Sequence, residues 1–219
     1  MEYFVNCNTA PLSPYTAPLD RSRVQHLFRR AGFSASVQTV DQAVGQSADA
    51  LVDSLISAAQ NLPPQPAPAW ATWNRDNYPE DDDLARQTIR AQQETWALEY
   101  TRGLLNNNLR DRLSFFWSNH FVTALDFYDS PAFLYEYTNC LQRNALGNFK
   151  PFVSEIGLTN AMLFYLDGAY NNGDNPNENY ARELFELFTL GEGNGYTEED
   201  VVETSRALSG YTERGDVRW

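Results

Sequence analysis

Apolar side chains recur every three or four residues through most of the chain, which is the spacing of one face of an α-helix. Residues that favour helix N-caps precede most of these stretches, and Gly or Asn follows many of them. No pair of strands and no internal repeat stands out. We therefore predict an all-α fold, an irregular bundle of about eight to ten helices. The longest periodic stretches are residues 21–31, 82–106, 109–121, 131–147 and 197–210.

Shorter helices are expected between these stretches. Ser34 or Ser36 can begin a helix that runs to Val44, and Ser47 can cap the next one. Asn148 and Thr159 are the caps expected for two further short helices.

Two proline-rich stretches interrupt the helical pattern. Residues 1–20 contain three prolines among Ser, Thr and Asn, and we expect an extended N-terminal arm there. Four prolines between Pro63 and Pro68 fix φ and remove backbone donors, so they cannot join a helix ladder. We predict a surface loop over residues 61–79 inside one helical domain that spans residues 21–219.

One predicted helix, residues 175–191, has the clearest start and stop signals. Asn175 suits the N-cap, and Pro176 suits the first helical position. The carboxylate of Glu178 is three residues after the cap, so it could close a capping box, and Gly191 supplies the stop. We expect this helix to organise the rest of the chain. Its polar sector consists of Glu178, Asn179, Arg182, Glu183, Glu186 and Thr189.

That polar sector has two interpretations, and periodicity favours neither. The first is a solvated face on which Glu178, Arg182 and Glu186 form a ladder of i, i+4 charge pairs. The second is a functional site in a cleft, in which Arg182 lies buried among the carboxylates and orients them. The oxygen ligands or acid/base groups of such a site would be Asn177, Glu178, Glu183 and Glu186.

Net charge and hydropathy exclude several classes of partner. The formal net charge is −13, so a nucleic acid or an anionic membrane surface would be repelled. The longest purely apolar run, Ala161 to Leu166, is far below the roughly 20 residues that span a bilayer, so we expect no transmembrane segment. The first residues show neither the basic nor the hydrophobic region of a signal peptide. Cys7 and Cys140 are consistent either with one disulfide or with two free thiols.

The chain has two histidines, and both lie in predicted helices. His26 lies beside the apolar stripe of the first helix. His120 ends the aromatic segment 115–121, near a helix C-terminus, where a positive charge is favoured. Each is typical of a packed histidine, and each is also a candidate metal ligand.

Several ordered segments resemble the bacterial family called domain of unknown function 1800. They are residues 26–33, 116–121, 144–149, 162–168, 177–191, 196–201 and 205–211. The resemblance runs from about residue 22 to residue 211. The chain has Ser118 where the family pattern usually has a second histidine, and it lacks the later helical half that contains a His-Asp pair.

The resemblance implies a mostly helical bacterial protein that is exported or associated with the cell envelope, and no established reaction. It also implies that a protein similar to sulfatases and alkaline phosphatases is encoded nearby. We therefore expect a binding or assembly component that docks this partner through an acidic helical surface. Its binding residues would be Asn177, Glu178, Arg182 and Asp167.

The alternative is metal-assisted hydrolysis, in which a divalent ion activates water. The chain has no His-Glu-x-x-His spacing, and it has no phosphate-binding loop, dinucleotide fingerprint or nucleophile elbow. Catalytic candidates are His120, Glu183 and Glu186, and metal candidates are His26, His120 and Glu183.

Overall fold

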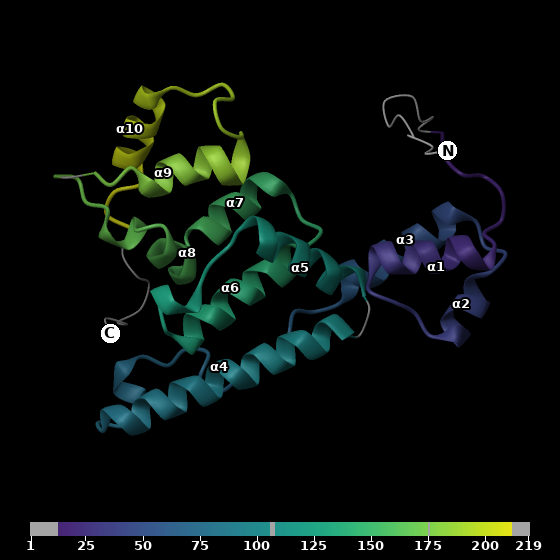
Figure 1. Ribbon diagram of the computed structural model, residues 1–219, viewed down its shortest axis with the longest axis horizontal. Coiled ribbons are helices and arrows are strands. Elements are labelled where there is room, and N and C mark those ends of the chain that lie inside the picture. The colour runs from purple at the N-terminus through teal and green to yellow at the C-terminus, as the bar shows by residue number, and fades with distance from the viewer. Residues whose placement is uncertain (1–12, 106–107, 175, 212–219) are drawn as a thin grey trace, which may run out of the picture.

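A computed structural model describes residues 13–105, 108–174 and 176–211 (Figure 1). Most of the predicted N-terminal arm, Cys7 and the predicted cap Asn175 lie outside the described residues. The described part is helical and contains no β-sheet, so the predicted all-α class is confirmed. Its ten α-helices are α1 (Arg21–Ala31), α2 (Val37–Ala43), α3 (Ala48–Asn61), α4 (Asp82–Leu105), α5 (Leu109–His120), α6 (Pro131–Asn144), α7 (Phe149–Gly157), α8 (Asn160–Tyr165), α9 (Asn179–Glu183) and α10 (Glu198–Ala207).

Most helices begin where the sequence places an N-cap. Ser36 and Ser47 accept hydrogen bonds from backbone N–H groups in the first turns of α2 and α3. Ser130 does the same for α6, and Pro131 occupies its first position. Thr197 and Asp200 form a reciprocal capping box at the start of α10. These starts are encoded locally, because the donor and the acceptor lie within three residues of each other.

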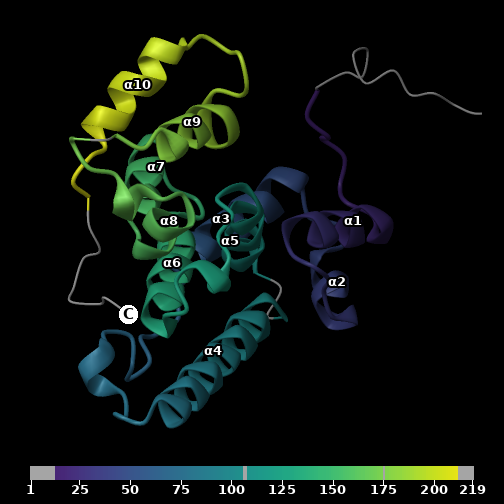
Figure 2. The ribbon, with the colours of Figure 1, turned by 60° about the vertical axis from the view of Figure 1, so that its left-hand side comes forward.

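Helix α6 lies at the centre of the fold, in contact with α4, α5, α7 and α8 (Figures 1 and 2). Cys140 and Leu141 of α6 are completely buried, and Phe133 and Tyr137 are nearly so. The prediction that residues 175–191 organise the chain is therefore wrong. A polar sector prevents that segment from being enclosed, whereas α6 buries residues along its whole length.

Helices α1, α2 and α3 form a smaller group with its own core, on the side of the molecule away from α9 and α10 (Figures 1 and 2). They meet the main body through contacts between α3 and α5. The ring of Phe33, just after α1, packs edge-on against Phe115 of α5 at a centroid distance of 6.1 Å. The Arg112 guanidinium lies 4.8 Å from the centroid of the same ring.

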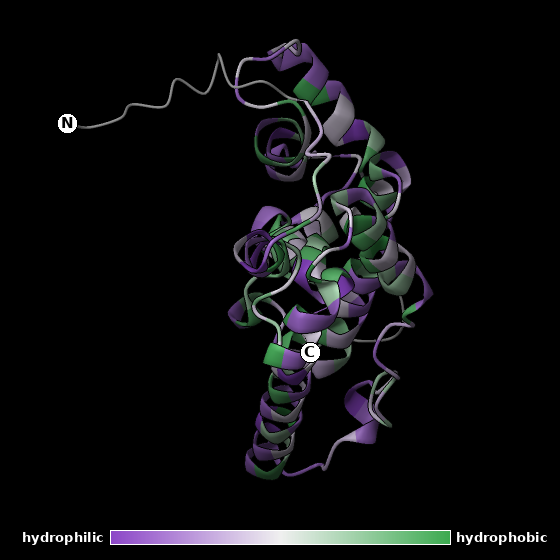
Figure 3. Ribbon diagram, turned by 90° about the vertical axis from the view of Figure 1, so that its right-hand side faces the viewer, coloured by the Kyte–Doolittle hydropathy of each residue, from purple (hydrophilic) through white to green (hydrophobic). Residues whose placement is uncertain are grey.

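The predicted loop at residues 61–79 contains one short 3₁₀-helix, Arg75–Asn77, and is otherwise irregular after Asn61. It precedes the long helix α4 in the sequence and runs beside it in space (Figures 1 and 3). It is only partly a surface loop. Tyr78 is buried and donates a hydrogen bond of 2.7 Å to Gln92 of α4. Burial raises the pKa of Tyr78 to about 12. Trp70 packs edge-on against Trp96, also on α4, at a centroid distance of 6.0 Å.

Candidate functional site

The predicted helix 175–191 begins later than its sequence suggests. Helix α9 starts at Asn179, and Glu178 makes no side-chain capping bond. The backbone N–H of Asn177 instead donates to Asn171 Oδ1 at 2.9 Å, which ties this part of the chain to the preceding loop. The side chain of Asn177 accepts from the Asn179 N–H, also at 2.9 Å. The helix therefore begins three residues later than predicted, and the bond expected between the Glu178 carboxylate and the N–H of Asn175 lies outside the described residues.

The second half of this segment, Leu184–Thr189, is a π-helix. Such widened turns are rare and frequently occur at functional sites. The predicted stop signal is confirmed at Gly191, two residues after the π-helix, where a φ of +88° favours glycine. Near this end the carbonyl of Phe188 lies 3.0 Å from His120 Nε2. A carbonyl can only accept, so Nε2 carries the hydrogen and Nδ1 is the acceptor of the neutral ring.

The polar sector of residues 178–189 divides into two stripes. Arg182 lies on the first stripe, between Glu178 and Glu186. Its guanidinium contacts Glu178 at 3.1 Å and Glu186 at 3.6 Å, which confirms the i, i+4 charge ladder. It also contacts Glu198 of α10 at 2.7 Å. Hydrogen bonding to Arg182 lowers the pKa of Glu198, and the same bond raises the pKa of Arg182.

The second interpretation, in which Arg182 lies buried among carboxylates that include Glu183, is wrong. The Arg182 side chain is 32% exposed, and its third partner is Glu198 rather than Glu183. The sequence indicates only that Glu198 suits the first turn of a helix. It does not indicate that α10 packs beside α9, which is what brings the two side chains together.

The second stripe faces a cavity of about 530 Å³ that we call the α9 cavity. One side is formed by Asn179 and Glu183 of α9 and by Leu187 of the π-helix, which are spaced four residues apart. The end of α5, the segment that follows it and the end of α8 complete the walls. The residues from these elements are Asn119, His120, Val122, Phe127, Tyr165, Leu166 and Asp167, and Phe188 closes the set.

Two carboxylates in the α9 cavity have no cationic partner among the described residues. They belong to Asp167 and Glu183, and neither carboxylate makes a hydrogen bond or an ion pair within that part of the chain. The backbone of Asp167 adopts the left-handed region, with φ 60° and ψ 12°. Asp is one of the few residues with a Cβ that tolerates this conformation.

The sequence pattern of the family described as "Protein of unknown function (DUF1800)" matches residues 26–218. The chain belongs to this family. The match confirms the resemblance seen in the sequence segments. No curated protein and no solved structure matches the chain. Since the family description names no activity, a function for this DUF1800 member has to be argued from its own residues.

The α9 cavity brings together three of the candidate site residues of this DUF1800 member, namely His120, Asp167 and Glu183. His26 lines a different cavity, at the N-terminal group of helices. The remaining candidates lie outside the α9 cavity and are Asn177, Glu178, Arg182 and Glu186.

Within the described ranges, no three His, Cys, Asp or Glu side chains are arranged to hold a metal ion. No helix in those ranges is both long enough and apolar enough to cross a bilayer.

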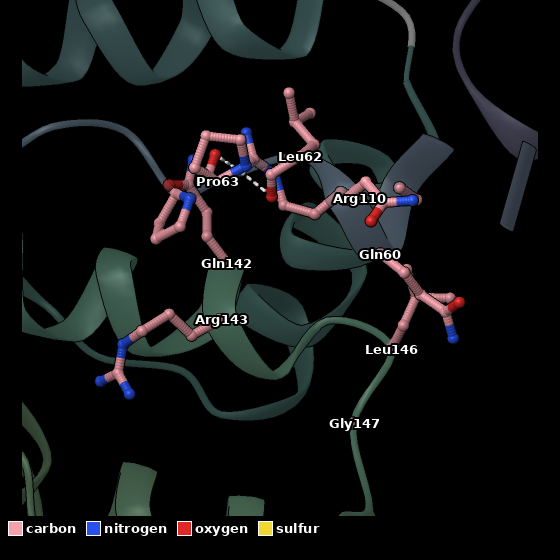
Figure 4. A pocket seen from close by; sticks show the side chains of 11 residues that line it. Gln60, Leu62, Pro63, Arg110, Gln142, Arg143, Leu146 and Gly147 are labelled. Carbon is pink, nitrogen blue, oxygen red and sulfur yellow. Dashed lines mark hydrogen bonds between the residues drawn. The ribbon is translucent and has the colours of Figure 1, made fainter. Parts of the chain in front are cut away.

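Another cavity, of about 350 Å³, lies between the start of the proline-rich loop, α5 and α6 (Figure 4). Arg110 on its wall is buried and pairs with Asp111 at 2.8 Å. Its guanidinium also donates to the carbonyl of Pro63. Arg143 points away from this group, toward Glu155 on α7. Because the buried charge is already matched within the fold, we interpret Arg110 as structural. Sequence reasoning missed it, since nothing in the segment 109–121 distinguishes a buried arginine from an exposed one.

Proposed function

We propose that this protein is a binding component that docks a partner protein at the α9 cavity. One observation carries the proposal: two carboxylates without a cationic partner among the described residues lie in a cavity with an exposed apolar rim. The rim residues Val122, Phe127 and Leu187 are 41%, 55% and 62% exposed. Large exposed apolar side chains beside a cavity are typical of protein interaction sites.

The partner segment that this surface fits carries a basic side chain flanked by apolar side chains. The basic group would neutralise Asp167 and Glu183, and the apolar groups would cover Phe127 and Leu187. The net charge of −13 favours the approach of such a segment. As the partner we propose the sulfatase-like or phosphatase-like protein that the family resemblance implies. Export to the cell envelope belongs to the same proposal and rests on the same resemblance.

Isothermal titration calorimetry between the two purified proteins tests the proposal. Leu187→Asn removes an apolar side chain from the rim without adding a charge that would attract the basic segment, and it should weaken binding by about tenfold or more. Leu98→Asn is the matched control, because Leu98 is 59% exposed on α4 and lies outside the cavity. This control should bind like the unmodified protein. Absence of binding, or equal losses in the two variants, would contradict docking at the α9 cavity.

Metal-assisted hydrolysis is the second candidate. His120, Asp167 and Glu183 line one cavity, although their side chains as placed do not form a metal-binding group, so a metal would have to draw them together. Of the two His120 ring nitrogens, only Nδ1 could serve as a ligand while Nε2 bonds to Phe188. Metal analysis of the purified protein distinguishes the two proposals. Stoichiometric zinc, manganese or iron that disappears in Glu183→Gln would favour hydrolysis over docking.

A further inference from the structure

The polar side chains of the α9 cavity direct donor groups to backbone carbonyls. Asn119 Nδ2 donates to the carbonyl of Phe115 at 3.2 Å, and Asn179 Nδ2 donates to the carbonyl of Leu166 at 3.1 Å. His120 Nε2 donates to the carbonyl of Phe188 at 3.0 Å. Three separate elements therefore fix the orientation of these side chains by the same kind of bond.

These bonds use the donor atoms of the three side chains and leave their acceptor atoms free to bind a ligand. The two amides retain their Oδ1 atoms, and the neutral imidazole retains Nδ1. Asp167 and Glu183 contribute two carboxylates, which when ionised can only accept. An anion, or a ligand rich in carbonyl groups, would find repulsion and few donors. The ligand that matches this lining is a cation that carries several N–H groups.

The cationic side chain nearest to Glu183 in the sequence forms its ion pairs outside the cavity. Arg182 precedes Glu183 directly, but its guanidinium bonds to Glu178 and Glu198 on the neighbouring stripe. The cavity wall contains no lysine and no arginine. Among the described residues, then, no cation neutralises the two carboxylates, which leaves them available to a cationic group that binds in the cavity.

We propose that the α9 cavity is a receptor for a guanidinium group, supplied by an arginine of the docked segment. This inference rests on the proposed docking function and specifies its chemistry. A guanidinium presents five donors in a flat fork, which suits several acceptors spread over one cavity better than the three donors of an ammonium. The aromatic rings of Phe127 and Tyr165, whose centroids are 5.0 Å apart, line the same cavity and offer surfaces on which a guanidinium can stack.

Small probes test the chemistry without the partner protein. N-acetyl-arginine amide, N-acetyl-lysine amide and N-acetyl-citrulline amide are titrated into the full chain, and chemical-shift changes are followed by NMR. Citrulline has nearly the shape of arginine but carries no charge. We expect the arginine probe to bind about tenfold more tightly than the citrulline probe, with lysine in between. Equal affinity for arginine and citrulline would overturn the inference.

Two variants locate the binding. Asp167→Asn removes the charge with a residue that also tolerates the left-handed backbone, and Glu183→Gln removes the other charge. Each should weaken the arginine probe by about tenfold. Glu199→Gln is the control, because Glu199 is exposed in the first turn of α10 and lies outside the cavity. An arginine affinity unchanged in both cavity variants would overturn the inference.

Failure of the inference and failure of the docking function are distinguishable. If the partner binds and Leu187→Asn weakens its binding while the arginine probe does not bind, docking stands and the guanidinium receptor is wrong. If the arginine probe binds through Asp167 and Glu183 while the partner does not bind, the receptor stands and this partner is wrong.

Discussion

Tyr180 shows how single residues fix the position of α9. Its hydroxyl donates a hydrogen bond of 2.6 Å to the carbonyl of Gly157, at the end of α7. Burial raises the pKa of this phenol, so it stays protonated and remains a donor. Gly157 and Gly168 both lie against the Tyr180 side chain, where a larger residue would collide with it. The start of α9, and with it Glu183, is thereby held against the end of α7 and the short 3₁₀-helix that follows α8.

Gly157→Ala should destabilise the protein. A Cβ at this position would lie 2.0 Å from the Tyr180 hydroxyl oxygen, so the ring would have to move and its hydrogen bond would be lost. We expect a loss of about 1 to 3 kcal/mol in the free energy of unfolding, measured by urea denaturation. Gly173→Ala is the control, since the nearest atom to its Cβ would be 3.9 Å away. Equal stability of the two variants would show that Tyr180 does not anchor α9.

Glu183→Gln should leave stability unchanged. The sequence suggested that this carboxylate balances a buried Arg182, in which case its loss would be costly. In the fold it faces the α9 cavity and has no ion pair among the described residues. We expect the thermal unfolding midpoint of the variant to match that of the unmodified chain, because no specific contact of the half-buried carboxylate is lost. A clear loss of stability would return Glu183 to a structural role.

Helices illustrate which parts of the fold can be predicted from sequence. The starts of α2, α3, α6 and α10 are predictable, because each cap and its donor lie within one turn. The start of α9 is not, because Asn171 holds Asn177 from six residues away. The same limit applies to the site. Candidate residues such as His120 could be chosen by type and position, but their grouping depends on how three helices pack.

The ion pairs of Arg182 join α9 to α10 and should control the local opening of α10. Arg182 is the residue through which Glu178 and Glu186 are linked to Glu198. In Arg182→Ala we expect faster amide hydrogen exchange in residues 198–207, with little change in α6, because the network is at the surface. Arg86→Ala, which breaks an exposed pair within α4, is the control and should leave α10 unchanged. Uniformly faster exchange across the chain would instead indicate a buried site.

The same contact predicts a pH dependence. The pKa of Glu198 is lowered in the fold by its bond to Arg182. Its contribution is therefore present above the ordinary pKa of a glutamate and is lost as the pH falls through the lowered value. Once the intrinsic exchange rate is corrected for pH, the protection of α10 amides should fall on acidification over that range. The fall should be smaller in Arg182→Ala, in which only the Asp200 capping box, whose pKa is also lowered by its bonds to Thr197, still titrates.

At the scale of the whole molecule, one cluster of buried polar side chains joins the proline-rich loop, α4, α5 and α6. Gln142 of α6 accepts from the backbone N–H of Gln65 at 2.8 Å and donates to Asp111 of α5 at 3.3 Å. The Gln65 side chain donates to the carbonyl of Glu99 on α4 at 2.7 Å. Arg110, which Figure 4 shows beside Pro63, completes the group by bonding to the carbonyl of Pro63 and to Asp111. The first residues of the proline-rich loop are thus fastened to the main body, although their composition is typical of an exposed linker.

Asp111→Asn should therefore be among the most damaging single substitutions in the chain. The side chains of Arg110 and Asp111 are only 6% and 2% exposed, so the variant leaves a buried guanidinium without its counter-charge. Breaking a buried pair in this way costs roughly 3 to 5 kcal/mol, which urea denaturation would measure. Asp83→Asn, which removes the partner of the exposed Arg86, is the control and should not move the unfolding midpoint.

Limited proteolysis adds a second measurement. In the unmodified chain cleavage should begin around the exposed residues Pro66 and Ala67, whereas in Asp111→Asn it should extend to residues 62–65 as the loop detaches. If both variants have the same stability and the same cleavage sites, the buried pair does not hold the loop to the bundle.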